Sequence, residues 1–451
     1  MSKGREVDMV HGSLFKKIVA FALPLIGSGV LQQSFNAVDI AVVGRFCGSH
    51  SMAAVGCNGP IINILLNLFI GISVGANVVI ANYIGQQHRR AIRDSVETVQ
   101  VIALASGILL AFLGTAFAVP MLEMMDTPGE VLGLASDYLR IYFLGMPFLM
   151  IYNFGAAIMR SMGDTKRPFY ALVVSGLVNV AFNLMLVLLF DMGVRGVAIA
   201  TVCANIVNAA VVVWWLSHEQ EPYRVHYRRF NVVKRELVKM LKIGVPAGVQ
   251  GMVFSFANIF IQASINGYGP EAMAGSAAAL NYEMYCYFVI SAFAQAAVAF
   301  VSQNYGAGDL ERCRRVTRQC MLLAMLFSGV ANIGISIFGN IFIIPFTDSP
   351  AVMEYALIRL HYVLMFQWIA SSYEISGAAM RGMGHSLTPT LITIFGTCVL
   401  RLVWIYFMSD RGFATLLIIY PITWTVTGIM TLAAYKWLLR KERSQFRSAA
   451  S

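Results

Sequence analysis

Four oxygen-bearing side chains in the first half of the sequence stand inside apolar segments, where polar groups are costly. They are Asp39, Asn179, Asn183 and Thr201. Asn179 and Asn183 are four residues apart and therefore share one helix face. Because hard cations such as Na⁺ prefer oxygen ligands, these side chains at similar depth predict a cation site. Each asparagine taken alone is better explained by hydrogen bonding between membrane helices. For Asp39 a functional role is favoured over a structural one, because no basic residue lies one helical turn away to pair with it.

Two acids stand inside apolar segments of the second half, at Glu283 and Glu374. A desolvated carboxyl can exchange protons near neutral pH, and it can also attract a cationic substrate. The structural alternative, of equal weight, pairs these acids with Arg401, Arg359 or His361. Glu283 and Glu374 are therefore candidates for a substrate or proton site.

Three smaller expectations concern other polar residues within apolar segments. Gln250 and Asn258 are added as substrate-site candidates in the second half. Asp137 and Arg140 are three residues apart, which predicts an ordinary ion pair along one helix. Gly71 and Gly75 form one G-x-x-x-G, a pattern that indicates close helix packing more often than dimerisation.

The segments that must position these residues are membrane spans. Hydrophobic residues make up 58% of the 451 residues and charged residues only 12%, against about 25% in soluble proteins. Apolar runs long enough to cross about 30 Å of hydrocarbon recur from end to end. We therefore expect an all-α polytopic membrane protein with twelve transmembrane helices. They are expected near 15–43, 51–83, 95–119, 131–159, 168–190, 193–217, 242–267, 272–304, 316–345, 352–380, 387–409 and 412–438.

The net charge of +10 follows the expected topology. Of the 33 basic residues, 27 fall in alternate gaps and at the two ends of the chain. The positive-inside rule then places both termini and the middle loop in the cytoplasm. Because these charges are spread over seven short stretches and form no single patch with aromatics, a nucleic-acid partner is not expected.

The two halves of the sequence repeat each other at a fixed offset of 221 or 222 residues. Pro24 aligns with Pro246, and the segment 157–168 aligns with 378–389. This indicates an internal duplication with a pseudo-twofold axis along the membrane normal. We expect an N-lobe at 1–217, a cytoplasmic linker at 218–241, a C-lobe at 242–440 and a cytoplasmic tail at 441–451. The acids do not repeat, since Ile261 stands opposite Asp39 and Leu400 or Arg401 stands opposite Asn179.

Several enzyme classes lack support in the sequence. There is no C-x-x-C pair, so no metal site of that type or disulfide framework is indicated. There is also no G-x-x-x-x-G-K-[ST] and no H-E-x-x-H. We therefore expect a protein that is not an enzyme and carries no cofactor.

Four segments of the sequence carry a family resemblance, namely Asn36-x-x-Asp39-x-x-x-x-Gly44-Arg45 and three loop segments at 159–165, 304–309 and 380–384. In these segments the chain resembles the multidrug and toxic compound extrusion (MATE) transporters of the bacterial type. It implies a transporter in the bacterial plasma or inner membrane. Its partners would be membrane lipid and amphipathic, mostly cationic small molecules, which it would export in exchange for Na⁺ or H⁺ by alternating access.

The resemblance also implies roles for individual residues. Asp39 matches the first-helix acid implicated in cation coupling, Asn179 an asparagine of the fifth helix, and Thr201 a hydroxyl residue of the sixth. Asn183 stands where many bacterial members have aspartate, so Asp39 is the only charge of the site. Glu283 matches the branch that has an acid in the eighth helix.

The protein is expected to be a monomer. Three other functions remain open at this point. A flippase or exporter of lipid-linked or other endogenous amphipathic metabolites would need several cationic side chains in its cleft, and Arg140, Arg359 and Arg401 are the candidates. A lipid-modifying membrane enzyme would need clustered His or acids, but the seven His are dispersed. A channel is disfavoured because the repeat is asymmetric.

Overall fold

The computed structural model describes residues 7–125, 127–226 and 231–450, and every regular element in these ranges is a helix. In a bilayer each backbone polar group must be satisfied inside the protein, which a helix does within one segment. The all-α class expected from composition is therefore confirmed.

Ten helices of the described chain are long and apolar enough to cross a membrane. An eleventh span results if α5 (Gly129–Leu144) and α6 (Met146–Ser161) count as one, bent by 47°. Pro147 at the start of α6 lacks an N–H and so contributes to this break. The expected span at 352–380 consists of three short pieces, and none of them reaches spanning length alone. These pieces are α13 (Pro350–Tyr362), the 3₁₀ helix η2 (Leu364–Ala370) and α14 (Ser371–Gly382).

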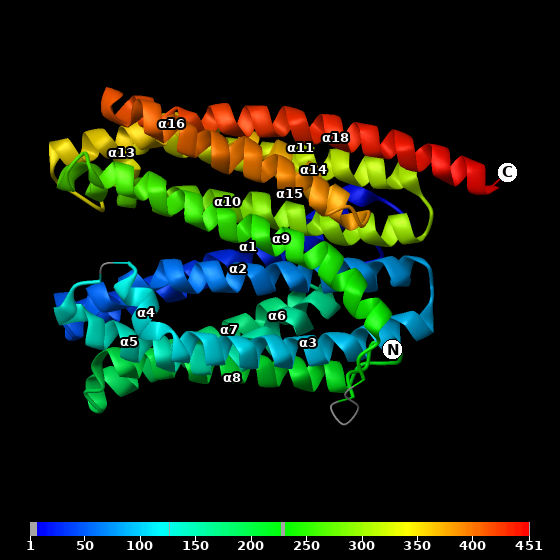
Figure 1. The fold of residues 1–451 in the computed structure, drawn as a ribbon, viewed down its shortest axis with the longest axis horizontal. Coiled ribbons are helices and arrows are strands. Elements are labelled where there is room, and N and C mark those ends of the chain that lie inside the picture. Colours follow the sequence, from blue (N-terminus) through cyan, green and yellow to red (C-terminus); the bar gives the residue numbers. More distant parts are fainter. Residues whose placement is uncertain (1–6, 126, 227–230, 451) are drawn as a thin grey trace. The chain divides into compact units, whose positions relative to one another are not determined.

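The chain divides into two compact units. The described part of the first unit comprises Val7 and the described residues within 27–248. Within it α3 lies alongside α6, and α6 contacts α8 (Figure 1). Besides α5 and α6 its helices are α2 (Ser49–Gly85), α3 (Arg89–Ala116), α4 (Ala118–Glu123), α7 (Lys166–Leu184), the π-helix η1 (Met185–Leu189) and α8 (Gly193–Ser217).

The second unit comprises residues 8–26 and the described residues from 249 onward. Within it α10 contacts α11 and α14, and α14 contacts α18. Besides α13, η2 and α14 its elements are α10 (Pro270–Gly306), α11 (Leu310–Ile337), α12 (Gly339–Ile343), α15 (Leu387–Thr393), the π-helix η3 (Ile394–Val399), α16 (Leu400–Met408), η4 (Ser409–Arg411), α17 (Phe413–Leu417) and α18 (Ile419–Ala450).

Two long helices are each shared between the units. The division falls within α1 (Leu14–Phe46) at Gly27 and within α9 (Lys234–Asn266) after Gly248. Each division lies two or three residues beyond a helix-interior proline, Pro24 or Pro246. The sequence division into lobes and linker contains no such exchange. Part of the expected linker is the first turns of α9, which begins at Lys234.

The first turns of α9 pack closely on α2 within the first unit. A Cβ atom on Gly71 would lie 2.2 Å from the backbone nitrogen of Gly248, and one on Gly75 would lie 2.2 Å from the carbonyl oxygen of Met240. Only glycine permits this approach of two helix backbones. The G-x-x-x-G pattern is thus a packing motif within this unit.

The duplication is visible in helix lengths. Helices α1 and α9 each have 33 residues, α2 and α10 each have 37, and α3 and α11 each have 28. Their start positions differ by about 220 residues, as the sequence repeat predicts. The repeat therefore sets the lengths of three helix pairs.

Candidate functional site

Asp39 lies buried in the first unit, on the second half of α1, and is 8% exposed. The side-chain nitrogen of Asn183 donates a hydrogen bond to its carboxylate. The same nitrogen lies 3.2 Å from the side-chain oxygen of Asn179. Both asparagines are buried on α7, and their i, i+4 spacing places them on one face. The structure thus brings together three of the four residues named from the sequence.

Thr201 on α8 completes this group. Its hydroxyl lies within hydrogen-bonding reach of the Asp39 carboxylate. It also lies 3.0 Å from the carbonyl oxygen of Val197, one turn earlier. A hydroxyl can donate one hydrogen bond and accept another. Thr201 can therefore donate to the ionised carboxylate of Asp39 or accept from its protonated form.

Two tyrosines near Asp39 were not identified from the sequence. Tyr138 and Tyr142 on α5 interact electrostatically with Asp39, and their rings stack with centres 5.9 Å apart. Their i, i+4 spacing on one helix was the available signal. The 18 tyrosines are spread over the whole chain, so tyrosine positions alone do not single out this pair.

The elements around Asp39 keep the site apolar apart from these groups. A cluster of buried side chains adjoins it, and α1, α2, α5, η1 and α8 contribute to this cluster. Its buried members are Val42, Val43, Val55, Tyr138, Val187, Val194, Val197 and Ala198. Asn183 stands two residues before η1, and π-helical turns within α-helices often occur at functional sites.

This arrangement can hold a hard cation or a proton. The side-chain oxygen of Asn183 is buried and has no hydrogen-bond partner within the described chain, so it is available as a ligand. No ion pair of Asp39 occurs among the described residues. Among the described residues no group of three or more His, Cys, Asp or Glu is placed to hold a metal ion.

Glu283 forms a buried ion pair in the second unit. Arg359 binds it through two nitrogens, at 2.6 and 3.0 Å, and both side chains are at most 6% exposed. The side-chain nitrogen of Gln367 also donates to the carbonyl oxygen of Glu283, at 3.1 Å. The structural alternative considered for Glu283, a pair with Arg359, is therefore present.

Glu374 accepts a hydrogen bond of 3.2 Å from the hydroxyl of Tyr287 and interacts electrostatically with Arg381. Arg381 in turn donates to the side-chain oxygen of Gln250, at 3.1 Å. Glu374 and Gln250 thus belong to one polar group of the second unit. The structure does not add Asn258 to it, because that side chain is exposed.

One expected ion pair is wrong. Asp137 pairs with Arg195 at the start of α8, with nitrogen–oxygen distances of 2.7 and 2.9 Å, and not with Arg140. Two charge-assisted hydrogen bonds from Nε and Nη2 of Arg195 to one carboxylate oxygen favour the contact between two helices over the weaker contact along one helix. Arg140 itself is exposed.

Comparison with known proteins gives consistent matches. The MatE family model matches residues 24–185 and again 246–407, which is an offset of 222. The chain is 28% identical over 441 residues to "Probable multidrug resistance protein YoeA" of Bacillus subtilis, covering 96% of this chain and 95% of that protein. It is 28% identical to "Probable multidrug resistance protein NorM" of Thermotoga maritima, covering 86% and 84%.

A solved structure described as "Crystal structure of MATE in the bent conformation" has the same fold. The TM-score is 0.90 at 21% identity, and the match covers 98% of this chain and 99% of that one. The double match of the family model confirms the internal duplication inferred from the sequence.

Proposed function

The chain belongs to the MatE family of membrane transporters, and we propose that it is a secondary antiporter exporting amphipathic, mostly cationic compounds. Relatives of near full-length coverage carry names of multidrug resistance proteins, which supports this substrate class. The exchanged ion is Na⁺ or H⁺. The protein is a multi-pass membrane protein, and its proposed location is a bacterial plasma membrane.

The observation that carries this proposal is the buried Asp39 with its amide and hydroxyl neighbours. A carboxylate inside a membrane helix is expensive unless a partner of opposite charge compensates it. In the described chain its hydrogen-bonding neighbours are Asn183 and Thr201, and neither is charged. A bound cation or proton would supply that charge, so binding at Asp39 is the proposed coupling step.

The proposed architecture has twelve spans, with both termini in the cytoplasm. The broken segment made of α13, η2 and α14 would form the tenth span, and the bent pair α5 and α6 the fourth. The distribution of basic residues supports this orientation. Transport would follow alternating access, with the coupling cation biasing the first unit toward substrate release.

The energy for export would come from the ion gradient. A membrane potential supplies about 2.3 kcal/mol per charge per 100 mV, so one coupled cation already drives useful accumulation. A proposed monomer contains both repeats and needs no second copy for this cycle.

A second candidate is an exporter of anionic, endogenous amphipathic metabolites, including lipid-linked ones. It requires cationic side chains in the interior that are not neutralised. Arg359 is paired with Glu283 and Arg140 is exposed, but Arg401 is buried without an acidic partner in the described chain. Arg401 is therefore the one observation that favours this candidate.

The test is substrate efflux from proteoliposomes that contain the purified protein. A cationic dye and an anionic amphipathic dye are loaded in separate preparations, and inward Na⁺ or H⁺ gradients are imposed one at a time. The proposal expects gradient-driven efflux of the cationic dye. Efflux that is equal with and without either gradient would contradict antiport, and efflux of the anionic dye alone would favour the second candidate.

A further inference from the structure

Arg401 of the second unit is 1% exposed and is the largest fully buried side chain among the described residues. Its Nε donates a hydrogen bond of 3.3 Å to the hydroxyl of Thr423. Its two terminal nitrogens are buried and make no hydrogen bond within the described residues. A guanidinium carries five N–H donors, so four of them lack a protein partner.

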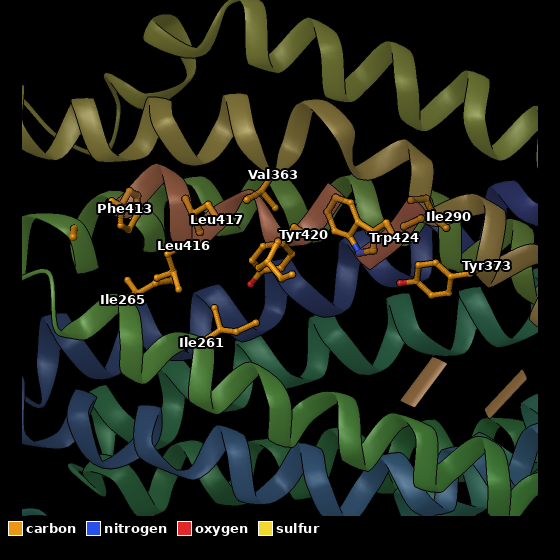
Figure 2. Close-up of a cluster of buried hydrophobic side chains, with 13 residues drawn as sticks. Ile261, Ile265, Ile290, Val363, Tyr373, Phe413, Leu416, Leu417, Tyr420 and Trp424 are labelled. Carbon is orange, nitrogen blue, oxygen red and sulfur yellow. The ribbon is translucent and has the colours of Figure 1, made fainter. Parts of the chain in front are cut away.

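Two aromatic rings cover this guanidinium. Its carbon lies 4.3 Å from the ring centre of Tyr420 and 5.5 Å from that of Phe254. Tyr420 also lies in the apolar cluster shown in Figure 2, with Ile261 and Trp424. Ring faces attract a cation but offer no acceptor for the terminal N–H groups. The rings therefore stabilise the charge without satisfying its hydrogen bonds.

The charges around Tyr420 do not balance. Arg359 lies over the same ring at 5.9 Å, but two of its nitrogens already bind Glu283. Of these two guanidinium groups beside one ring, Arg359 has an acidic partner and Arg401 has none among the described residues. An unpaired buried charge is costly, so its retention calls for an anion that binds it.

The internal duplication relates Arg401 to the Asp39 site by sequence position. At an offset of 222 residues Arg401 corresponds to Asn179 and Thr423 to Thr201, and at an offset of 221 Leu400 corresponds to Asn179. Thr201 lies within hydrogen-bonding reach of the Asp39 carboxylate, and Thr423 accepts from the guanidinium of Arg401. Each repeat therefore holds a buried charged residue beside a threonine, and the two charges are of opposite sign.

We propose that Arg401 is the anchor of an anion-binding site in the second unit. The ligand class is an amphipathic molecule with a carboxylate or phosphate head. The two free terminal nitrogens form a fork that matches two oxygens of such a head, and the aromatic rings provide contact for an apolar body. Binding requires Tyr420 or Phe254 to move, because these rings cover the guanidinium. The inference adds to the proposed export function and does not depend on which ion drives it.

The test is calorimetric titration of the purified full-length protein in neutral detergent. The probes are hexyl phosphate, inorganic phosphate and hexyltrimethylammonium. The unmutated protein is expected to bind hexyl phosphate. Arg401→Met should weaken this binding at least about tenfold, because it removes a bidentate charge-assisted contact. It should leave hexyltrimethylammonium binding unchanged. Arg140→Met, which removes an exposed arginine, is the matched control and should bind like the unmutated protein.

The probes also separate two sources of the anion. Binding of both phosphates would assign the site to a free anion, and binding of hexyl phosphate alone would assign it to an amphipathic one. If Arg401→Met does not fold, Arg401→Lys carries the test, since a point charge replaces the fork and binding should fall several-fold. Failure of the unmutated protein to bind either phosphate, or unchanged binding in the Arg401 variant, would overturn the proposal. Neither result bears on gradient-driven export, which is measured separately.

Discussion

The side-chain amide of Asn183 donates a hydrogen bond to the carboxylate of Asp39, 144 residues earlier in the chain. The same nitrogen also contacts the side-chain oxygen of Asn179. One amide thus joins α1 to α7 and orients the only acid of the site. The function proposed for Asp39 therefore depends on a neighbour that carries no charge.

Replacement of that neighbour should impair transport. Asn183→Leu removes the donor to Asp39 and leaves a desolvated carboxylate without this partner, which costs roughly 1–3 kcal/mol or more. We expect gradient-driven dye efflux to fall at least about tenfold. Initial efflux rates in proteoliposomes with equal protein content measure this. Asn340→Leu, at an exposed amide, is the control, and full activity of Asn183→Leu would refute the role of the amide.

The Glu283–Arg359 pair should behave as a structural element. Glu283→Leu or Arg359→Met alone leaves one buried charge unpaired and should cost about 3–5 kcal/mol of stability. The double variant Glu283→Leu/Arg359→Met removes both charges and should recover most of this loss. Thermal unfolding in detergent gives the three values and the coupling energy.

An exposed pair supplies the comparison for that cycle. Asp137→Asn breaks the contact with Arg195, whose side chain is 64% exposed, and should cost about 0–1 kcal/mol. If the Glu283 and Arg359 single variants were as stable as Asp137→Asn, the buried pair would not contribute to the stability of the fold.

The contact between α2 and α9 should tolerate no side chain at Gly75. Gly75→Ala places a Cβ atom about 2.2 Å from the carbonyl oxygen of Met240, so the helices must separate. We expect a loss of about 1–3 kcal/mol by thermal unfolding, as for overpacked cores. Gly59→Ala on the same helix meets nothing within 4 Å and should be neutral or slightly stabilising. Equal melting temperatures for the two variants would contradict this packing.

Arg312 holds the segment before α1 within the second unit. Its terminal nitrogen donates to the carbonyl oxygens of His11, at 2.9 Å, and Gly12, at 3.1 Å. Arg312→Met should therefore increase hydrogen exchange at residues 9–13 without changing exchange in α10. Mass spectrometry of the full-length protein measures this, and Arg318→Met, at an exposed arginine, is the control. Unchanged exchange in both variants would show that the contact does not restrain the segment.

The Asp8 carboxyl before α1 predicts how the stability of this segment depends on pH. Burial raises the pKa of the Asp8 carboxyl, but the N–H groups of His11 and Val10 together with Lys17 outweigh this and hold the pKa below its ordinary value of 3.8. A depressed pKa contributes stability above the unfolded value that is lost as the pH falls through the folded one. Protection of residues 9–13 from exchange, expressed relative to the intrinsic exchange rate at each pH, should thus be constant above about pH 5 and fall only in strong acid.

Much of the fold was predictable because apolar runs and repeats are local or periodic signals. The spans around Asp39 and Asn183 and the packing role of Gly71 follow from such patterns. The break between α13 and α14 could not be predicted from such patterns. Residues 364–370 are as apolar as their neighbours, yet they form a 3₁₀ helix and not an α-helix. The shared helices α1 and α9 also escaped prediction, since sequence carries no direct signal for which unit a helix end contacts.

The candidate site divides in the same way. Residue type and i, i+4 spacing were sufficient to group Asn179 with Asn183 and to select Asp39. Partner choice was not predictable: Asp137 pairs with Arg195 across two helices, and Arg401 has no acidic partner among the residues that the structure describes. Such pairings depend on which helices pack together and on the direction in which each arginine side chain points. Residue spacing along the sequence predicts neither.

The central claim is that Asp39 couples an ion gradient to export. Asp39→Asn keeps the size of the side chain and an oxygen that can accept from Asn183, so the fold should be retained. Dye efflux is measured in proteoliposomes under Na⁺ and H⁺ gradients in turn, with Asp137→Asn as the matched acid-to-amide control. We predict that Asp39→Asn loses efflux under the gradient that drives the unmutated protein, while Asp137→Asn transports normally. Efflux by Asp39→Asn equal to that of the unmutated protein under both gradients would contradict the account.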